Sequence, residues 1–312
     1  MKKFVLVVSI LMSVSFAKSQ TAEEYSDLAT KKSEQKDFQY AMVLINKAIA
    51  IDGKSQWYYL QKAEIQFKLS GPEDAIKIVK SAISLDNKKA EPYNRAGSYY
   101  GSLGMADSAI AMYNDAIKYA ENDTIKNSYI TNRGTAKLGI RDFKGAIIDF
   151  ETALVFDPMN IAALNNASGC YSELGMMDKS IATLKKIIKL DSTFIGPYIN
   201  LGFNYSDTDS LDLALKYFNK ALKIDPKEPS TINNRGYVYY KKGDFTSALT
   251  DINLSIKLYP TNSYAYRNLA LVYIAMKKNN EACTALGYAK DYGFEQHYGS
   301  EVSELISKYC KK

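Results

Sequence analysis

One residue type recurs along this chain at a constant interval. Asparagine stands at five positions that are each 34 residues apart: Asn132, Asn166, Asn200, Asn234 and Asn268. A fixed period of this length is typical of arrays of one supersecondary unit, in which each unit contacts only its neighbours. Such arrays grow along one axis, so the 312-residue chain is expected to form a single repeat array rather than two ordinary domains.

Aligning the sequence on this spacing divides it into eight repeats of two helical halves each. Both halves show the 3.6-residue periodicity of amphipathic helices. Six of the seven steps between repeats are 34 residues long, and the third is 37, which places a three-residue insertion around residues 120–126. The predicted repeat starts are Ala22, Gln56, Ala90, Asn127, Ile161, Ile195, Pro229 and Ser263.

Three positions in each repeat have a constant size. The eighth residue is alanine, glycine or serine in every repeat, and the twentieth is alanine or serine; Gly202 and Ala214 are examples. The twenty-fourth residue is usually large, as at Phe218. Small residues let two helices approach closely, because the distance between packed helices depends on the side chains at their contact. Each repeat is therefore predicted to be a closely packed helical hairpin.

This pattern resembles the tetratricopeptide repeat family, whose unit is a 34-residue helix–turn–helix. The resemblance implies an all-α, right-handed superhelical solenoid in which the first helix of each repeat lines a concave groove. We assign the eight repeats to residues 22–296. Residues 297–312 are predicted to form a C-terminal capping helix, because the last unit of a solenoid needs a cover for its apolar face.

The first residues predict an export signal. Two lysines precede an apolar run from Phe4 to Ala17, which is the pattern of a cleaved secretory signal peptide. We assign the signal peptide to residues 1–17, with cleavage as late as residue 20. An uncleaved anchor is the alternative, but the run is shorter than the roughly 20 apolar residues that span a bilayer. The mature chain is expected to be periplasmic or extracellular, with no integral membrane segment.

Cysteine positions bear on the fold because exported proteins meet oxidising conditions. Cys283 follows the small twentieth residue of the last repeat, where other repeats carry an aliphatic residue or methionine that we expect to face the next repeat. Cys310 lies on the apolar side of the predicted capping helix. We therefore predict a Cys283–Cys310 disulfide, the alternative being two buried free thiols. Cys170 is expected to be a buried packing residue.

The sequence contains no recognisable catalytic or nucleotide-binding motif. The single histidine, His297, lacks the partners of a catalytic triad or a metal site, and no glycine-rich phosphate loop is present. The net charge of +6 is mild, and the Lys/Arg stripe typical of nucleic-acid binding is missing. We expect a protein that is not an enzyme and has no cofactor, no metal site and no nucleic-acid partner.

The resemblance also implies which side chains face the groove, namely residues two, five, six, nine, twelve and thirteen of each repeat. The asparagine row occupies position six. A carboxamide can pair with both the C=O and the N–H of a peptide unit, so the row could bind an extended backbone while its neighbours provide specificity. The candidate peptide-binding residues are Asn132, Asn166, Asn200, Asn234, Asn268, Asn94, Arg95, Asn165, Asn233, Trp57, Phe203, Tyr237 and Arg267.

The expected function is non-catalytic binding of an extended peptide or protein segment in the concave groove. Asparagine is common at this position in the family, so the row could instead hydrogen-bond neighbouring helices or water. Two other functions remain open. The chain could be a scaffold that holds folded partners through its edges or convex face in a cell-envelope assembly, or a module that recruits an enzyme encoded elsewhere.

Overall fold

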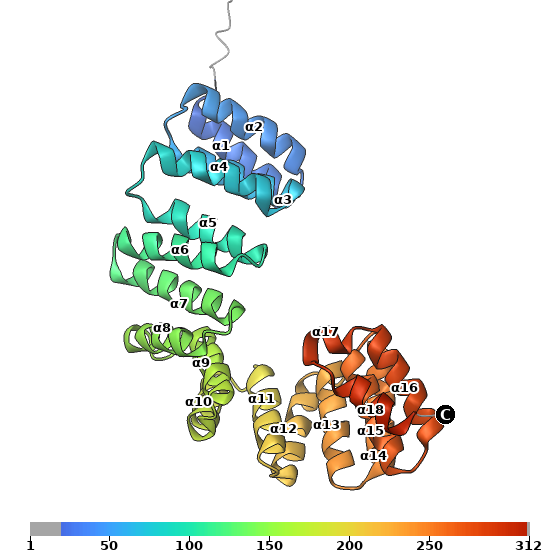
Figure 1. Cartoon of the computed structure of the whole chain (residues 1–312). Coiled ribbons are helices and arrows are strands. Elements are labelled where there is room, and N and C mark those ends of the chain that lie inside the picture. The colour runs from blue at the N-terminus through green and yellow to red at the C-terminus, as the bar shows by residue number, and fades with distance from the viewer. Residues whose placement is uncertain (1–19, 311–312) are drawn as a thin grey trace, which may run out of the picture. The chain divides into compact units, whose positions relative to one another are not determined.

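The computed structural model describes residues 20–310. The predicted signal peptide, residues 1–17, lies outside the described residues. Every regular element of the described part is a helix (Figure 1), and none of these helices is long and apolar enough to cross a membrane. The chain divides into two compact units, an N-terminal unit that ends at Tyr129 and a C-terminal unit that begins at Ile130.

The N-terminal unit contains helices that pack in consecutive pairs. They are α1 (Ala22–Glu34), α2 (Phe38–Ile51), α3 (Gln56–Ser70), α4 (Pro72–Leu85), α5 (Ala90–Ser102) and α6 (Ala106–Lys118). Helix α7 (Asp123–Gly139) contains the boundary between the two units.

The C-terminal unit continues the same pairing and ends in two short helices. It contains α8 (Phe143–Phe156), α9 (Ile161–Glu173), α10 (Met177–Leu190), α11 (Gly196–Asp207), α12 (Leu211–Ile224), α13 (Pro229–Lys241), α14 (Phe245–Leu258), α15 (Ser263–Ala275), α16 (Asn279–Asp291), α17 (Phe294–Tyr298) and α18 (Glu301–Tyr309). Up to α15, the odd-numbered helices correspond to the first halves of the sequence repeats, and we call them the first helices.

Close approach within each pair follows from the small eighth residue of the repeat. A methyl group at Gly202 would lie 2.5 Å from the Phe218 ring, and one at Gly97 would lie 2.7 Å from the Tyr113 ring. Both rings are buried. The space that a side chain would occupy at the eighth position is thus filled by the large twenty-fourth residue, so a larger side chain there would force the two helices apart.

Most turns between paired helices contain one residue in the left-handed conformation. Glycine adopts this conformation without steric cost, whereas other residues lose about 1–2 kcal/mol. The residues with positive φ in these turns are Gly104, Gly175 and Gly243 in three turns, and Lys36, Arg141, Asp209 and Lys277 in four others.

Helix α7 begins at Asp123, earlier than the start at Asn127 that the sequence spacing predicts. The Asn122 side chain accepts a hydrogen bond of 2.9 Å from the backbone N–H of Ile125. This is the bond of an asparagine N-cap, which favours helix initiation at the next residue. The three inserted residues therefore lengthen a first helix instead of a loop.

The C-terminal cap consists of two helices in place of the single helix predicted for residues 297–312. Gly293 and Gly299, with φ of 80° and 90°, bracket α17 and interrupt the helical path. Phe294 of α17 and Val302 of α18 are buried against the last helix pair. The cover of the array therefore begins at Phe294, before the predicted start.

A disulfide joins Cys283 of α16 to Cys310, which directly follows α18. The two Cα atoms are 5.6 Å apart, within the usual range for disulfides. The bond links the second cap helix covalently to the last helix pair. Cys170 is free and buried, and burial raises the pKa of its thiol to about 11, so this thiol stays protonated at neutral pH.

Candidate functional site

Two asparagines of the row have amides that are free to bind. Asn200 on α11 and Asn234 on α13 are half-buried, and neither side chain has a hydrogen-bond partner among residues 20–310. Each amide offers two donor hydrogens and one acceptor oxygen. These two groups are therefore available to a ligand that lies along the first helices.

Phe203 projects from α11 one turn after Asn200 and is 53% exposed. It lines two cavities of about 160 Å³ each. Glu173 and Asn200 help to line one cavity, and Asn234 and Tyr237 help to line the other. We use the name Phe203 surface for the residues at positions six, nine and thirteen of these two repeats, which are Asn200, Phe203, Asp207, Asn234, Tyr237 and Lys241.

The two earlier asparagines of the row have contacts within the chain. The Asn166 side chain donates a long hydrogen bond of 3.4 Å to the Thr135 hydroxyl. Asn132 on α7 is half-buried and already interacts within the chain. Asn165, beside Asn166, buries its side-chain oxygen without a hydrogen-bond partner, so that oxygen does not face solvent. Of these three asparagines, Asn166 is the one whose amide could give up its long hydrogen bond to Thr135 and bind a ligand in its place.

The last asparagine of the row is not accessible, which corrects its assignment as a peptide-binding residue. Asn268 on α15 is fully buried, and Asn233 is 1% exposed. The Asn268 amide donates to the Asn233 oxygen at 3.2 Å, and its oxygen accepts from Arg267 at 2.8 Å. Asn268 and Asn233 therefore join two neighbouring first helices inside the protein.

Arg267 also has a structural role, which corrects its assignment to the groove. Its guanidinium lies 5.5 Å from the ring centres of both Tyr237 and Tyr264 and donates to the Glu301 carboxylate at 3.0 Å. Only 11% of its side chain is exposed. Arg267 thus connects α15 to the cap helix α18 and covers one face of Tyr237.

Asn94 and Arg95 of α5 belong to a polar network inside the N-terminal unit. Glu91 accepts hydrogen bonds from Arg95 at 2.8 Å, from Asn94 at 3.3 Å and from the Tyr129 hydroxyl at 3.2 Å. Arg95 also lies 3.6 Å from Glu64. Burial, followed by the neighbouring Glu91 carboxylate, raises the pKa of Tyr129 to about 12. These side chains satisfy one another, so less of their binding capacity is left for a ligand.

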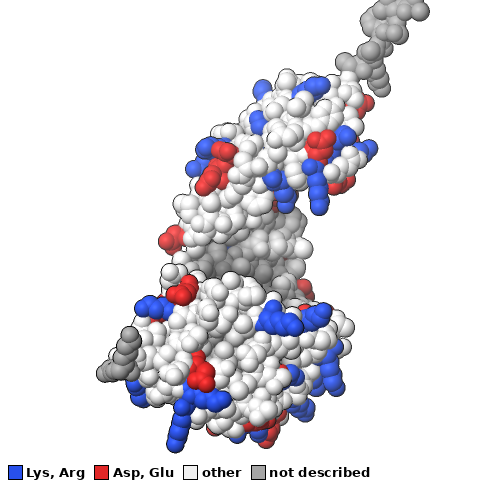
Figure 2. Space-filling view, turned by 90° about the vertical axis from the view of Figure 1, so that its right-hand side faces the viewer, with Lys and Arg blue, Asp and Glu red and all other residues white. Residues whose placement is uncertain are grey.

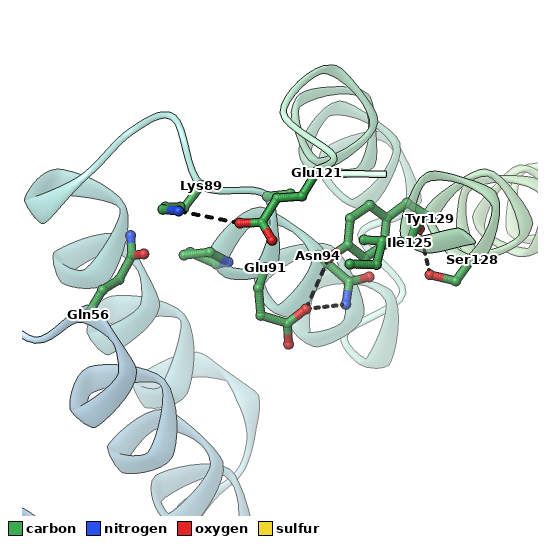
Figure 3. Close-up of a pocket in the computed structure, with 10 residues that line it drawn as sticks. Gln56, Lys89, Glu91, Asn94, Glu121, Ile125, Ser128 and Tyr129 are labelled. Carbon is green, nitrogen blue, oxygen red and sulfur yellow. Dashed lines mark hydrogen bonds and ion pairs between the residues drawn. The ribbon is translucent and has the colours of Figure 1, made fainter. Parts of the chain in front are cut away.

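A cavity of about 440 Å³ adjoins this network (Figure 3). Its lining includes Glu91, the Lys89–Glu121 ion pair of 3.3 Å, and Ile125 and Ser128 from the start of α7. This cavity was not predicted from the sequence. The sequence feature that could have indicated the cavity is the three-residue insertion, because the insertion lengthens α7 and the start of α7 forms part of the cavity wall.

Trp57 lies at the start of α3 and is 54% exposed. It lines a cavity of about 210 Å³ together with Glu34, Gln61 and Arg95. The Gln61 amide donates to the Thr30 hydroxyl at 3.0 Å. The exposed indole therefore stands beside a position-six side chain that is already hydrogen-bonded, unlike the amides next to Phe203.

Comparison with known proteins identifies this arrangement of helix pairs. A model described as tetratricopeptide repeat matches residues 90–123 and 161–194, and one described as anaphase-promoting complex, cyclosome, subunit 3 matches residues 207–289. A solved tetratricopeptide repeat protein from Parabacteroides merdae is similar with a TM-score of 0.71 at 15% identity, covering 82% of this chain and 99% of that chain. The chain folds as a tetratricopeptide-repeat solenoid.

Other relatives of this solenoid are distant in sequence. The structure of YrrB, described as a TPR protein with an unusual peptide-binding site, has a TM-score of 0.52 at 21% identity over 64% of this chain and 97% of that chain. Stress-induced-phosphoprotein 1 of Caenorhabditis elegans is 22% identical over 55% of this chain and 63% of that protein. A TPR repeat-containing protein of Methanocaldococcus jannaschii is 26% identical over 49% of this chain and 34% of that protein. The chain thus covers less than two thirds of these two relatives.

Tetratricopeptide-repeat proteins in general mediate protein–protein interactions. In this solenoid the Phe203 surface offers free amides, an exposed ring and the Asp207 carboxylate, a set that can bind a peptide but does not form a catalytic constellation. Asp207 and Glu173 were not among the predicted binding residues. Both are the thirteenth residues of their repeats, so the implied groove positions already included them.

Proposed function

We propose that this solenoid is a non-catalytic binding protein that holds an extended peptide or protein segment on the Phe203 surface. The observation that carries the proposal is the half-exposed Phe203 ring between the free amides of Asn200 and Asn234. An extended segment has unpaired backbone N–H and C=O groups that carboxamides can match. Each such hydrogen bond contributes about 0.5–1.5 kcal/mol net, and side chains of the segment can enter the two cavities beside the ring.

The spacing of the first helices suits an extended ligand. Helices α9, α11 and α13 are consecutive neighbours in contact, and packed helices lie about 8–10 Å apart. An extended chain advances about 3.3 Å per residue, so roughly three ligand residues pass each repeat. A segment of about nine residues would therefore cross all three helices and reach both free amides.

The charge distribution supports a protein ligand over a nucleic acid. Figure 2 shows Lys and Arg interspersed with Asp and Glu on the face that it presents, with uncharged surface between them. Binding a phosphate backbone would need several aligned basic side chains, because that contact is mainly electrostatic. The proposed ligand is therefore a protein or peptide and not a nucleic acid.

We place this function outside the cytoplasm, in the periplasm or outside the cell. The support is the sequence pattern of residues 1–17, which is that of a secretory signal peptide. The Cys283–Cys310 bond agrees with an oxidising compartment. N-terminal sequencing of the protein from its native cells tests this placement, since a retained Met1 would contradict export by signal cleavage.

The binding site is tested by a cross-linking pull-down from native cells with two matched aromatic variants. Phe203→Ala is expected to reduce partner capture at least tenfold, because it removes the ring between the free amides. Tyr259→Ala removes a ring of similar exposure (54%) at the end of α14 and is expected to leave capture unchanged. Circular dichroism establishes equal helicity for both variants. Equal capture by Phe203→Ala and the wild type would reject the Phe203 surface as the main site.

One observation favours a second function, a scaffold that holds folded partners through an outer helix. On α8, Ile148 and Val155 lie seven residues apart on one face and are 63% and 85% exposed. Phe156 and Met159 extend this exposed apolar group, and such groups can mark protein interfaces. Loss of capture in Val155→Ser with full capture in Phe203→Ala would favour the scaffold.

A further inference from the structure

We propose that the segment held on the Phe203 surface presents an arginine or lysine, whose charged group lies on the Phe203 ring and pairs with the Asp207 carboxylate. This inference rests on the proposed function and adds the chemical class of the ligand: a basic peptide segment. It is carried by an internal arrangement in the next repeat and by the charges around Phe203.

The protein contains the proposed arrangement one repeat further along. Tyr237 is the ninth residue of its repeat, as Phe203 is of the preceding one. The Arg267 guanidinium lies 5.5 Å from the centre of the Tyr237 ring and donates to the Glu301 carboxylate at 3.0 Å. The first helices thus already place a guanidinium over the ring at the ninth position, and a carboxylate of the cap helix α18 neutralises it.

Phe203 has a ring at the same repeat position and a nearby carboxylate, Asp207, which comes from its own helix and not from a cap helix as Glu301 does, but it lacks the cation. The residue that corresponds to Arg267 in the preceding repeat is Asn233, which is buried and bonded to Asn268. Within residues 20–310, no Lys or Arg lies over the Phe203 ring. One cationic side chain from a ligand would complete the set.

The carboxylate near Phe203 is Asp207, which follows it by four residues on α11. Residues with this spacing are neighbours on the surface of a helix. Asp207 is exposed and lines one of the two Phe203 cavities, and it has no ion-pair or hydrogen-bond partner in the described part of the chain. It is therefore free to pair with a charge that lies on the ring.

The other charges around the ring do not neutralise Asp207. Lys241 is bound elsewhere, at 2.9 Å from Asp209 and at 2.8 Å from a backbone oxygen of α11. On the other side of the ring, Glu173 lines the second cavity, but its carboxylate already pairs with Arg141 at 3.4 Å, so Asp207 is the carboxylate of this surface that is left unpaired. A positive side chain is thus the complement of this surface, whereas an acidic one would be repelled.

An apolar ligand residue could also cover the ring, but it would leave Asp207 partly desolvated and unpaired, which lowers affinity. A cation over an exposed ring and an exposed ion pair each change affinity by a few fold. The basic residue is therefore expected to improve binding about tenfold over an uncharged residue of the same shape. This is a preference large enough to measure by peptide titration.

The test begins with a random 12-residue peptide library selected against the wild-type protein. The selected peptides are resynthesised with citrulline, which keeps the shape of arginine without its charge, and affinities are measured by fluorescence anisotropy. We expect peptides whose binding is lost in Phe203→Ala to contain a basic residue, and its replacement by citrulline to weaken binding about tenfold. Selected peptides without any basic residue that still need Phe203 would overturn the inference.

Protein variants assign the preference to the two side chains. Asp207→Asn is expected to bring the affinities for arginine and citrulline peptides within about twofold, and Phe203→Leu, which keeps an apolar group, is expected to reduce the preference partly. The control is Asp212→Asn on α12, which removes an exposed carboxylate that pairs with Lys242 at 2.7 Å. This variant should prefer arginine peptides over citrulline peptides as strongly as the wild type does. Thermal unfolding and circular dichroism show whether each variant folds.

Two failures can be distinguished. If peptides bind in a Phe203-dependent manner but the preference for arginine is absent, or survives Asp207→Asn, the basic-ligand inference is wrong and the proposed peptide site stands. If the selection yields no peptide that depends on Phe203, the proposed site itself is wrong and the inference falls with it.

Discussion

The N-terminal and C-terminal units use the same repeat position differently. Position six of the N-terminal unit is occupied by Asp27, Gln61 and Arg95. Asp27 is exposed, whereas Gln61 and Arg95 are bonded within the unit, to Thr30 and to Glu91. In the C-terminal unit Asn200 and Asn234 occupy it without partners among residues 20–310, whereas Asn268 at the same position is buried and bonded. A polar group that is already paired gains little from a new partner. The repeat period therefore predicts where a side chain lies on the first helix. Whether that side chain is available to a ligand depends on the residues that surround it in the folded protein.

The largest expected difference between the units follows from the disulfide. Replacing Cys283 and Cys310 together by serine should lower the free energy of unfolding of the C-terminal unit by about 3–4 kcal/mol, because the cross-link restricts the unfolded chain. The N-terminal unit should be unaffected. Hydrogen exchange of α1–α4 and of α15–α18, followed by mass spectrometry, measures the two units separately. Equal losses in both would show that they unfold together.

Two asparagines of the row within the C-terminal unit should differ in how much they contribute to stability. Asn268→Ala should cost about 1–3 kcal/mol of stability, because it leaves the buried Asn233 side chain without its partner. Asn234→Ala should change stability by no more than about 0.5 kcal/mol, as for other partly exposed positions without partners. Urea unfolding of both variants decides the comparison. Similar losses would mean that Asn234 also has a structural partner.

A smaller effect is expected for position six of the N-terminal unit. Arg95→Met keeps most of the side-chain stem but removes the contacts to Glu91 and Glu64, and should cost about 1 kcal/mol, since partly exposed ion pairs are weak. This cost should shrink in high salt, because salt screens the lost attraction. Asn200→Ala, measured in the same salt series, should show neither the cost nor the salt dependence.

The smallest effect concerns the turns. Lys277 has φ of 60° where the preceding repeat has Gly243 with φ of 79°. Lys277→Gly should stabilise the protein by about 0.5 kcal/mol, since relief of steric strain exceeds the added entropy of the unfolded chain. Gly243→Ala should destabilise it by about 1 kcal/mol. Thermal unfolding curves of the two variants should shift in opposite directions.

The sequence predicts the helical hairpins because their determinants lie within one repeat. The pairing of Gly202 with Phe218 is an example: both residues belong to the same hairpin, and their sizes alone require a close approach. The start of α7 was not predicted, since it depends on the Asn122 side chain bonding to the backbone beyond the insertion.

The candidate site was predicted less completely than the fold. The sequence placed Phe203, Asn200 and Asn234 on the first helices, but it could not separate them from Asn268. The burial of Asn268 depends on Asn233 in one neighbouring helix and on Arg267, whose position is fixed by Glu301 in the cap. The residue types that make these contacts do not recur from repeat to repeat, so only the structure shows which amides remain free.

The cap also limits how this array could lengthen. Glu301 of α18 contacts Arg267, which precedes it by 34 residues, so α18 begins at the register of the first helix of a further repeat. A repeat added at this end would have to displace α18 and break the link between Cys283 and Cys310. Duplication of an internal hairpin requires no such loss. An added repeat is therefore expected to be tolerated inside the array and not at this end, and a C-terminal fusion partner is best attached after Cys310.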